Sequence, residues 1–298
     1  MRQCTCPEIA AFLTELRRED LAVSTIASYE RDLVAFATWF EGTTSEAFAP
    51  QAVTPSDVRD HKSYLRTVRR RQAATVNRRL AALRKFFLWA RVTGRITDLP
   101  TLEVKSVPTG SRTPKSLAKR EADRLIRTVE QSGNTRDLAV LLTLRHTGVR
   151  VGELCALRLA DLTILDRKGS MLVRSGKGDK DRTVPLNNDV RVALRAYFAR
   201  RPAATDDHVF IGQRGEALQP EAVQLIVRKY ARRAGLAGVT PHILRHTFAK
   251  QVLDAGADLT TVSRLLGHER LDTTAIYTQP TARDLVEAVQ RLERHDAE

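Results

Sequence analysis

The segment 106–117 divides the chain into two parts and thereby limits the folds available to it. It contains two prolines, one glycine and three serines, and its apolar residues follow no helical or strand period. Such a composition is typical of an interdomain linker. A chain of 298 residues is long enough to bury a separate core on each side of that linker. We therefore predict a first domain over residues 1–105, a linker over 106–117 and a second domain over 118–298.

The part before the linker has an almost purely helical pattern. Ser24 can cap one helix, and Thr54 with Pro55 can start another that runs toward Arg70. A third helix is predicted over residues 73–92, because apolar residues recur there at spacings of three and four. The expected core positions are Ile26, Tyr29, Leu33, Phe36 and Phe40 in the first helix and Val76, Leu80, Leu83, Phe87 and Ala90 in the third.

Basic and polar side chains occupy the other face of the third helix and the loop before it. Such a face could follow the phosphate backbone of a nucleic acid. The alternative is an ordinary solvated face, since many helices with a basic side bind nothing. The candidate DNA contacts in this part are Arg69, Arg70, Arg71, Asn77, Arg78, Arg84 and Lys85.

The part after the linker has the pattern of a mainly helical domain with a small antiparallel sheet. Two short strands are predicted at 170–174 and 182–186, around the glycine-flanked turn SGKGDKD, which is a hairpin signal. Helices are predicted over 119–130, 135–147, 189–200, 220–234, 241–255 and 258–266.

The charge balance also favours a nucleic-acid partner. Lysine and arginine number 49 against 35 aspartates and glutamates, giving a net charge of +14 and a pI near 10.2. A field of this sign attracts polyanions, although an arginine-rich soluble protein without such a partner would share the composition. The predicted helix 220–234 adds candidate DNA contacts at Arg228, Lys229, Arg232 and Arg233.

Membrane, secretion and metal signals are absent from the sequence. No apolar run approaches the roughly 18–20 residues of a membrane span, and the N-terminus lacks the pattern of a secretory signal. The three cysteines have no second Cys pair or His cluster to complete a metal site. We therefore expect a reduced, cytoplasmic protein that uses no metal and no cofactor; with DNA as its partner, it would be associated with the nucleoid.

Arg150 lies at a predicted helix junction, where it could face an anion. It follows Gly148, at which one helix ends and another begins. Glu153 is three residues further on, on the same helical face, and could hold the guanidinium in place. Taken alone, the pair could equally be a surface ion pair that contributes little to stability.

The sequence TPHILRH predicts a helix start that favours an anion. Thr240 and Pro241 are a cap and a first helical residue, which places His242 in the first turn and Arg245 on the same face. The positive end of a helix disfavours imidazolium, so a neutral His242 could accept a proton. A structural histidine is the alternative, and it is the preferred interpretation of His246.

Three further residues, Lys177, His268 and Tyr277, are candidates for a functional site. Lys177 lies between two glycines in the predicted turn, where the backbone can approach a ligand closely. A glycine can end the preceding helix and release the chain at His268. Tyr277 follows nine residues later, between the potential cap Asp272 and the helix terminator Pro280. Taken singly, such a tyrosine is more often a packing residue than a nucleophile.

Four blocks in the chain, TGVRVGEL, GKGDKDRTVPL, TPHILRHTFA and LLGHERLDTTAIY, resemble the signature blocks of the tyrosine recombinases, the phage-integrase and Xer-type family. They stand in the family's order and spacing, and the resemblance covers essentially the whole chain. It implies a mainly α fold with a small antiparallel sheet. A helical, SAM-like core-binding domain and a catalytic domain would form a clamp around DNA.

The resemblance implies a site-specific DNA recombinase that needs neither metal nor ATP. Tyr277 would attack the scissile phosphate to form a 3′-phosphotyrosyl bond, and strand exchange would pass through a Holliday junction. Two alternatives share the residues: a type IB topoisomerase-like enzyme that relaxes DNA, and a DNA-binding regulator that has lost catalysis. The Xer-like first domain favours recombination over the former, and the intact catalytic set argues against the latter.

The family mechanism assigns a role to each of the other matched residues. Arg150 and Arg245 would bind the nonbridging phosphate oxygens as charge develops. Lys177 would protonate the leaving 5′-oxygen, and His242 would act as general base or proton relay. His268 would donate a hydrogen bond to the phosphate.

The resemblance also implies particular partners. They are double-stranded DNA with paired inverted binding sites, other recombinase subunits in a tetrameric synapse and, where required, accessory proteins. A tail helix from about residue 281, with apolar residues at helical spacing, could dock onto a neighbouring subunit. Integration, excision, transposition and dimer resolution are all compatible with the sequence.

Overall fold

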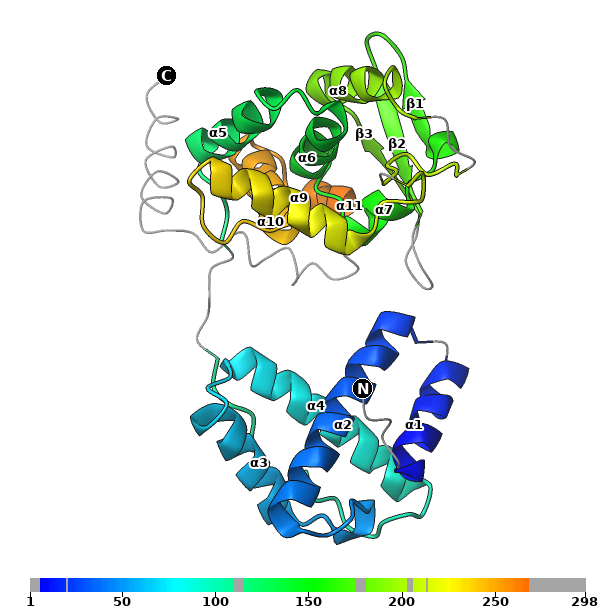
Figure 1. Cartoon of the computed structure of the whole chain (residues 1–298), viewed down its shortest axis with the longest axis vertical. Coiled ribbons are helices and arrows are strands. Elements are labelled where there is room, and N and C mark those ends of the chain that lie inside the picture. Colours follow the sequence, from blue (N-terminus) through cyan, green and yellow to red (C-terminus); the bar gives the residue numbers. More distant parts are fainter. Residues whose placement is uncertain are drawn as a thin grey trace, which may run out of the picture. The chain divides into compact units, whose positions relative to one another are not determined.

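The computed structural model forms two compact units, Met1–Ser111 and Arg112–Glu298 (Figure 1). The residues that the structure describes are 6–19, 21–109, 115–174, 181–202, 206–212 and 214–267. Among them, no helix has the length and apolar character needed to cross a membrane.

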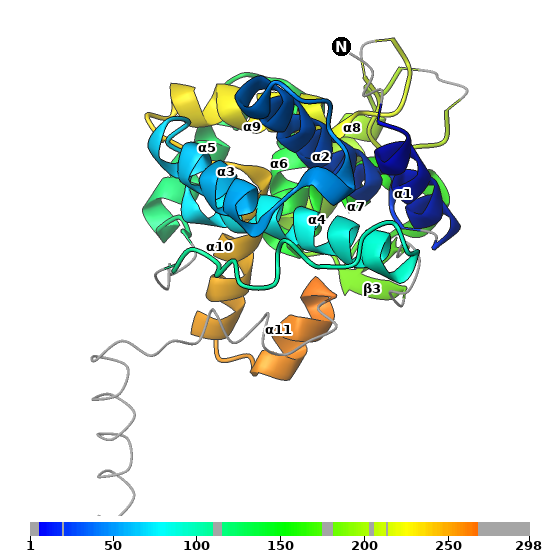
Figure 2. The same cartoon turned by 90° about the horizontal axis from the view of Figure 1, so that it is seen from below.

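The described residues of the first unit form four helices and one short 3-10 turn. Both views show α2 and α4 lying between α1 and α3 (Figure 1, Figure 2). Phenylalanine rings on α1, α2 and α4 fill the space between them, and each is at most 1% exposed; they are Phe12, Phe36, Phe40, Phe86 and Phe87. The elements are α1 (Pro7–Arg18), α2 (Val23–Thr44), η1 (Pro50–Ala52), α3 (Pro55–Thr67) and α4 (Ala73–Val92).

One of the two predicted helix caps in this unit is confirmed and the other is wrong. The Thr54 hydroxyl accepts from the backbone N–H of Asp57, whose carboxylate accepts from the N–H of Thr54, so α3 starts with a complete capping box. Helix α2 begins at Val23, so Ser24 lies inside its first turn rather than before it. Ala22 occupies the cap position and offers no side-chain acceptor.

In the second unit, helices pack around a central helix, and a small sheet lies at one edge (Figure 1). Helix α6 packs against α5, α7, α8, α9 and α10 (Figure 1). The elements are α5 (Lys119–Glu130), α6 (Thr135–Thr147), α7 (Val151–Ala156), η2 (Leu159–Asp161), β1 (Leu162–Ile164), β2 (Gly169–Val173), β3 (Arg182–Pro185), α8 (Asn188–Phe198), α9 (Pro220–Arg233), α10 (Pro241–Asp254) and α11 (Leu259–Leu266). The predicted class, mainly α with a small antiparallel sheet, is confirmed.

The sheet has the order β1-β2-β3, with both pairs antiparallel. Val173 at the end of β2 pairs with Arg182 at the start of β3. The segment that contains Lys177 therefore connects two paired strands, as the hairpin prediction required. Strand β1 was not predicted from the sequence, because its three residues are too few to show an alternating pattern.

The chain stays packed on the first unit beyond α4. Val104 and Val107 are buried, although Val107 already belongs to the predicted linker. Asn77 on α4 holds this segment through two hydrogen bonds with the backbone of Val107 (2.7 and 2.9 Å). The extent of the linker over 106–117 stays a prediction.

Candidate active site

Arg150 is positioned by the sharp end of helix α6. Gly148 ends that helix in the left-handed region, with a φ of 64°, and Arg150 then precedes α7 as its N-cap residue. Glu153 accepts a hydrogen bond from the backbone N–H of Arg150 (2.7 Å) and another from Nη1 of its guanidinium (2.8 Å). The predicted role of Glu153 in holding this guanidinium is confirmed.

Arg245 lies on α10, deep in the same part of the second unit. The Thr240 hydroxyl caps α10 and Pro241 is its first residue, as predicted. Arg245 is only 3% exposed. Its Nη1 donates to the carbonyl of Gly148 (2.6 Å) and its Nη2 to that of Leu266 (2.7 Å). The turn between α6 and α7 therefore contains Arg150 and also binds Arg245 through the Gly148 carbonyl. Both predicted phosphate-binding arginines thus lie at this turn.

The C-terminal end of α11 brings three arginines together. Gly267 ends this helix with a φ of 66°, which confirms it as the predicted C-cap. The last carbonyls of a helix carry partial negative charge and favour cations. Three of them accept from guanidinium groups: Leu265 from Arg182 Nε (3.0 Å), Leu266 from Arg245 Nη2 (2.7 Å) and Gly267 from Arg150 Nη2 (3.1 Å).

Arg182 belongs to this cluster, although its sequence context gave it no predicted role. Both of its terminal nitrogens donate to the carboxylate of Glu153, at 3.0 and 2.7 Å. One signal could have revealed it. Arg182 and the buried Val184 are two residues apart in β3, so their side chains lie on the same face of the strand. The strand period therefore places this arginine toward the core.

His242 lies in the first turn of α10, with its ring 4.1 Å from that of His246. Partial burial of the ring lowers the pKa of His242, and the nearby positive charge of Arg245 lowers it further. The direction of this shift agrees with the predicted neutral ring, and burial and Arg245 are its causes. Burial, followed by the charges of His242 and Arg245, lowers the pKa of the buried His246 to about 4.

Lys177, His268 and Tyr277 lie outside the described residues, as do Asp272, Pro280 and the predicted tail helix. Lys177 and His268 belong to segments that adjoin described residues. Lys177 is in the connection between β2 and β3, and His268 directly follows Gly267 in the chain. The roles of all three remain predictions.

Four of the predicted DNA contacts on α4 have partners within the first unit. Arg78 pairs with the buried carboxylate of Asp32, and Lys85 pairs with Glu19 at 3.0 Å. Asn77 holds Val107, as described above, and Arg84 donates to the carbonyl of Val104 (2.5 Å) and to the Ser106 hydroxyl (3.2 Å). These contacts supply a structural role for each residue, while their contact with DNA stays a prediction.

The loop 69–71 presents its three arginines to solvent. Arg69, Arg70 and Arg71 are all exposed, and Arg70 adopts a φ of 46°, which is uncommon for a residue with a side chain. Burial lowers the pKa of the nearby Arg79; Asp32 opposes this, and the positive charges of Arg71, Arg78 and Arg69 lower it further. Crowded cations of this kind favour a bound anion.

The predicted basic residues of α9 are also on its surface. Arg228, Lys229, Arg232 and Arg233 are all exposed. Lys229 lies 3.5 Å from the buried carboxylate of Asp137 and 4.5 Å from the centroid of the Tyr230 ring. Two of the others, Arg228 and Arg232, line a surface hollow with the turn that follows α9.

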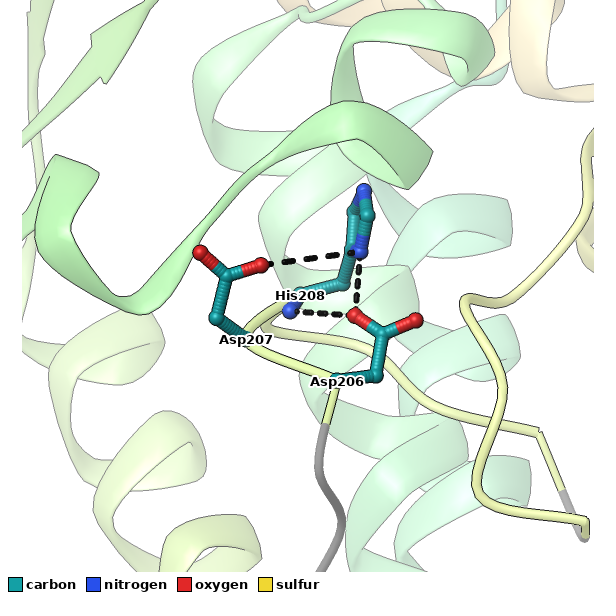
Figure 3. A group of neighbouring side chains, drawn as sticks. All are labelled: Asp206, Asp207 and His208. Carbon is teal, nitrogen blue, oxygen red and sulfur yellow. Dashed lines mark hydrogen bonds and ion pairs between the residues drawn. The ribbon is translucent and has the colours of Figure 1, made fainter.

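Among the described residues, Asp206, Asp207 and His208 form a group of potential metal ligands (Figure 3). Both carboxylates already have partners. Asp206 contacts the His208 ring and accepts from the backbone N–H of His208 (2.9 Å) and of Ala217 (3.1 Å). Asp207 accepts from Arg158 through both carboxylate oxygens, each at 2.9 Å. The contacts are those of a structural turn.

Both units are similar to families of known proteins. The phage integrase family matches residues 115–283, and the phage integrase N-terminal SAM-like domain matches residues 5–94. The tyrosine recombinase XerC of Roseiflexus castenholzii is 36% identical over 282 residues, covering 91% of this chain and 88% of the relative. The tyrosine recombinase XerA of Pyrococcus furiosus is 35% identical over 287 residues, covering 94% of this chain and 92% of the relative.

A solved structure shows the same fold. The XerH site-specific recombinase, bound to a palindromic difH substrate in a post-cleavage complex, has a TM-score of 0.76 at 23% identity, covering 98% of this chain and 86% of that chain. A SAM-like helical unit followed by an integrase-type catalytic unit defines a tyrosine recombinase. This chain belongs to the phage integrase family, and it is a site-specific recombinase related to the Xer proteins.

Proposed function

We propose that this recombinase cuts one DNA strand at a time with Tyr277 as nucleophile and Arg150 and Arg245 as the phosphate-binding pair. The observation that carries the proposal is the arginine cluster at the end of α11. It contains three arginines and one glutamate, Glu153, so these four side chains carry a net charge of +2. A phosphodiester that gains charge in its transition state is the ligand that such a cluster stabilises.

The covalent step exchanges one phosphate ester for another. The Tyr277 oxygen attacks phosphorus and forms a 3′-phosphotyrosyl bond, while the bond to the 5′-oxygen breaks. A neutral His242 takes the tyrosine proton, and Lys177 gives a proton to the 5′-oxygen, so a 5′-hydroxyl leaves. His268 donates a hydrogen bond to a nonbridging oxygen. The phosphotyrosyl ester keeps the energy of the broken bond, so rejoining needs no ATP.

The second half of the reaction involves DNA and further subunits. A duplex with two inverted binding sites would hold two recombinase subunits, and two such duplexes would form a tetrameric synapse that exchanges strands through a Holliday junction. The net charge of +14 and the exposed arginines of the loop 69–71 and of α9 support the DNA part. Accessory proteins and association with the nucleoid would follow from the same role.

Residues 281–298 are proposed to dock onto a neighbouring subunit in that synapse. Their apolar residues recur at helical spacing at Ala282, Leu285, Val289 and Leu292. A chain truncated after Pro280 should bind a single site normally but assemble and recombine poorly. Recombination by the truncated chain at the rate of the full chain would refute the docking role.

Covalent trapping tests the nucleophile and identifies the target. The protein is incubated with fragmented genomic DNA from the organism that encodes it, and the DNA that resists detergent removal is sequenced. A synthetic duplex of that sequence, nicked near the cleavage point, loses its short 5′-hydroxyl fragment and traps the adduct. Wild type should accumulate this adduct. Tyr277→Phe should bind the duplex with the same affinity and trap nothing, and an adduct formed by that variant would exclude Tyr277.

A further inference from the structure

The Arg182 side chain is largely shielded from solvent, and its guanidinium donates to protein acceptors. Its side chain is 9% exposed. Nη1 and Nη2 donate to Oε1 and Oε2 of Glu153 at 3.0 and 2.7 Å, and Nε donates to the carbonyl of Leu265 at 3.0 Å. Three of its five N–H groups therefore have protein acceptors, and two of these acceptors are the oxygens of the Glu153 carboxylate, which offsets its charge. Arg245 donates to neutral carbonyls instead. We therefore expect Arg182 to act on DNA through its neighbours.

Glu153 is shared between Arg182 and Arg150. Oε1 accepts from Nη1 of both arginines, and Oε2 accepts from the backbone N–H of Arg150 and from Nη2 of Arg182. Burial raises the pKa of Glu153, but the hydrogen bonds from Arg182 and Arg150 outweigh it and bring that pKa below its ordinary value. One ionised carboxylate therefore sets the position of two guanidinium groups.

Arg182 also touches the helix end that holds the phosphate-binding arginines. Leu265, whose carbonyl it binds, immediately precedes Leu266, the acceptor for Arg245. A Cβ added to Gly267 would lie 2.7 Å from Nη1 of Arg182, so the backbone passes directly against this guanidinium. The contacts close a ring: Arg182 to Glu153, Glu153 to Arg150, Arg150 to Gly267, and along α11 back to Arg182 through Leu265.

We propose that Arg182 is a positioning residue that fixes Arg150 relative to Arg245 at the scissile phosphate. The inference rests on the proposed function of those two arginines. Without Arg182, Glu153 would pair with Arg150 alone and draw its guanidinium toward the carboxylate, while the end of α11 would lose its anchor on β3. A buried ion pair that only stabilises the fold is the competing interpretation. The two interpretations predict different cleavage rates for a substrate whose scissile group carries no negative charge.

The test compares a charged and an uncharged scissile group in single-turnover cleavage. The nicked duplex recovered by trapping is made with either the natural phosphate or a methylphosphonate, which lacks one negative oxygen and depends less on arginine placement. Arg182→Ala should cleave the phosphate substrate on the order of 10²-fold more slowly than wild type, as when one oxyanion donor is removed. On the methylphosphonate substrate, its cleavage should be only about tenfold slower than that of wild type. Arg150→Ala should show the same pattern, and Arg182→Lys, which keeps the charge without the planar fork, should lie between.

Arg174→Ala is the matched control. Arg174 follows β2, as Arg182 opens β3, and it pairs with Asp161 at 2.8 Å rather than with Glu153. Its loss should change cleavage of both substrates by the same small factor. An equal loss on both substrates for Arg182→Ala and Arg182→Lys would overturn the positioning role and leave only stabilisation. Failure of the proposed function would look different, since wild type would then form no adduct or Arg150→Ala would cleave both substrates normally.

Discussion

Gly148 shows how a single backbone position serves two purposes in the active site. Its φ of 64° ends α6, and its carbonyl accepts the 2.6 Å hydrogen bond from Arg245. A Cβ at this position would overlap the Phe248 ring and lie 2.9 Å from the Leu266 side chain. Both the conformation and the close packing therefore require glycine.

Gly148→Ala should destabilise the second unit and impair cleavage, whereas Gly133→Ala should only destabilise it. Gly133 has nearly the same φ, 67°, but a Cβ there would have no atom within 4 Å, so alanine adds only backbone strain of roughly 1–2 kcal/mol. Overpacking at Gly148 adds about 1–3 kcal/mol. Denaturation followed by circular dichroism gives the two costs, and adduct formation gives the activity. Equal costs for the two variants would contradict the packing argument.

His61 makes the first unit sensitive to acid. Its ring is 2% exposed and packs 4.9 Å from Phe36 and 4.8 Å from Trp39, and its Nδ1 has no hydrogen-bond partner among the described residues. Burial, with a smaller effect from Arg79, lowers the pKa of His61 to about 4 from an ordinary 6.5. The unfolded chain then binds the proton first as the pH falls. We therefore expect the contribution of His61 to the stability of the first unit to be fully present above pH 6.5 and to be lost toward pH 4, a change of roughly 3 kcal/mol.

His61→Phe should remove this part of the pH dependence. Both tryptophans of the chain, Trp39 and Trp89, lie in the first unit, so urea unfolding followed by their fluorescence reports on that unit. The variant should be at least as stable as wild type at pH 7, and its advantage should grow as the pH falls to about 4.5, which lies between the two pKa values. Parallel stability curves over this range would show that His61 is not the titrating group.

At the level of elements, sequence periodicity predicted the long helices because each buries one face. Helix α4 has the predicted bounds, and its expected core residues Val76, Leu80 and Leu83 are at most 1% exposed. The short strand β1 depends on pairing, and the contacts of Arg182 depend on partners that are distant in the sequence; the period of β3 indicates only that Arg182 points toward the core. The same holds for the α4 face, where Arg78 has a buried acid as partner that no local pattern reveals.

The two predicted caps in the first unit provide a test at this level. Thr54→Ala removes a side chain that accepts from the N–H of Asp57, and it should destabilise the first unit by about 1 kcal/mol. Ser24→Ala lies within the first turn of α2, whose cap residue is Ala22, and should change stability by less than about 0.5 kcal/mol. Tryptophan fluorescence measures both. A larger cost for Ser24→Ala than for Thr54→Ala would contradict the assigned helix starts.

For the whole molecule, the net charge of +14 matters only where cations are available to a partner. Some basic residues neutralise acids within the protein, as Arg78 does for Asp32, which is 3% exposed. Others, such as Arg71, are exposed in a loop with neighbouring arginines. Only the second kind should release counterions from DNA on binding, so the two kinds differ in how their loss changes the salt dependence of affinity.

Arg71→Ala should lower the slope of log Kd against log salt concentration by about one, since each phosphate contact contributes about 0.9. Fluorescence anisotropy with a labelled duplex of arbitrary sequence measures this slope, because phosphate contacts do not depend on the recombination site. Arg78→Ala should leave the slope unchanged and instead destabilise the first unit by about 1–3 kcal/mol, because it deprives a buried carboxylate of its closest partner. A slope that falls for Arg78→Ala but not for Arg71→Ala would reverse this assignment, and α4 rather than the loop 69–71 would then follow the phosphate backbone.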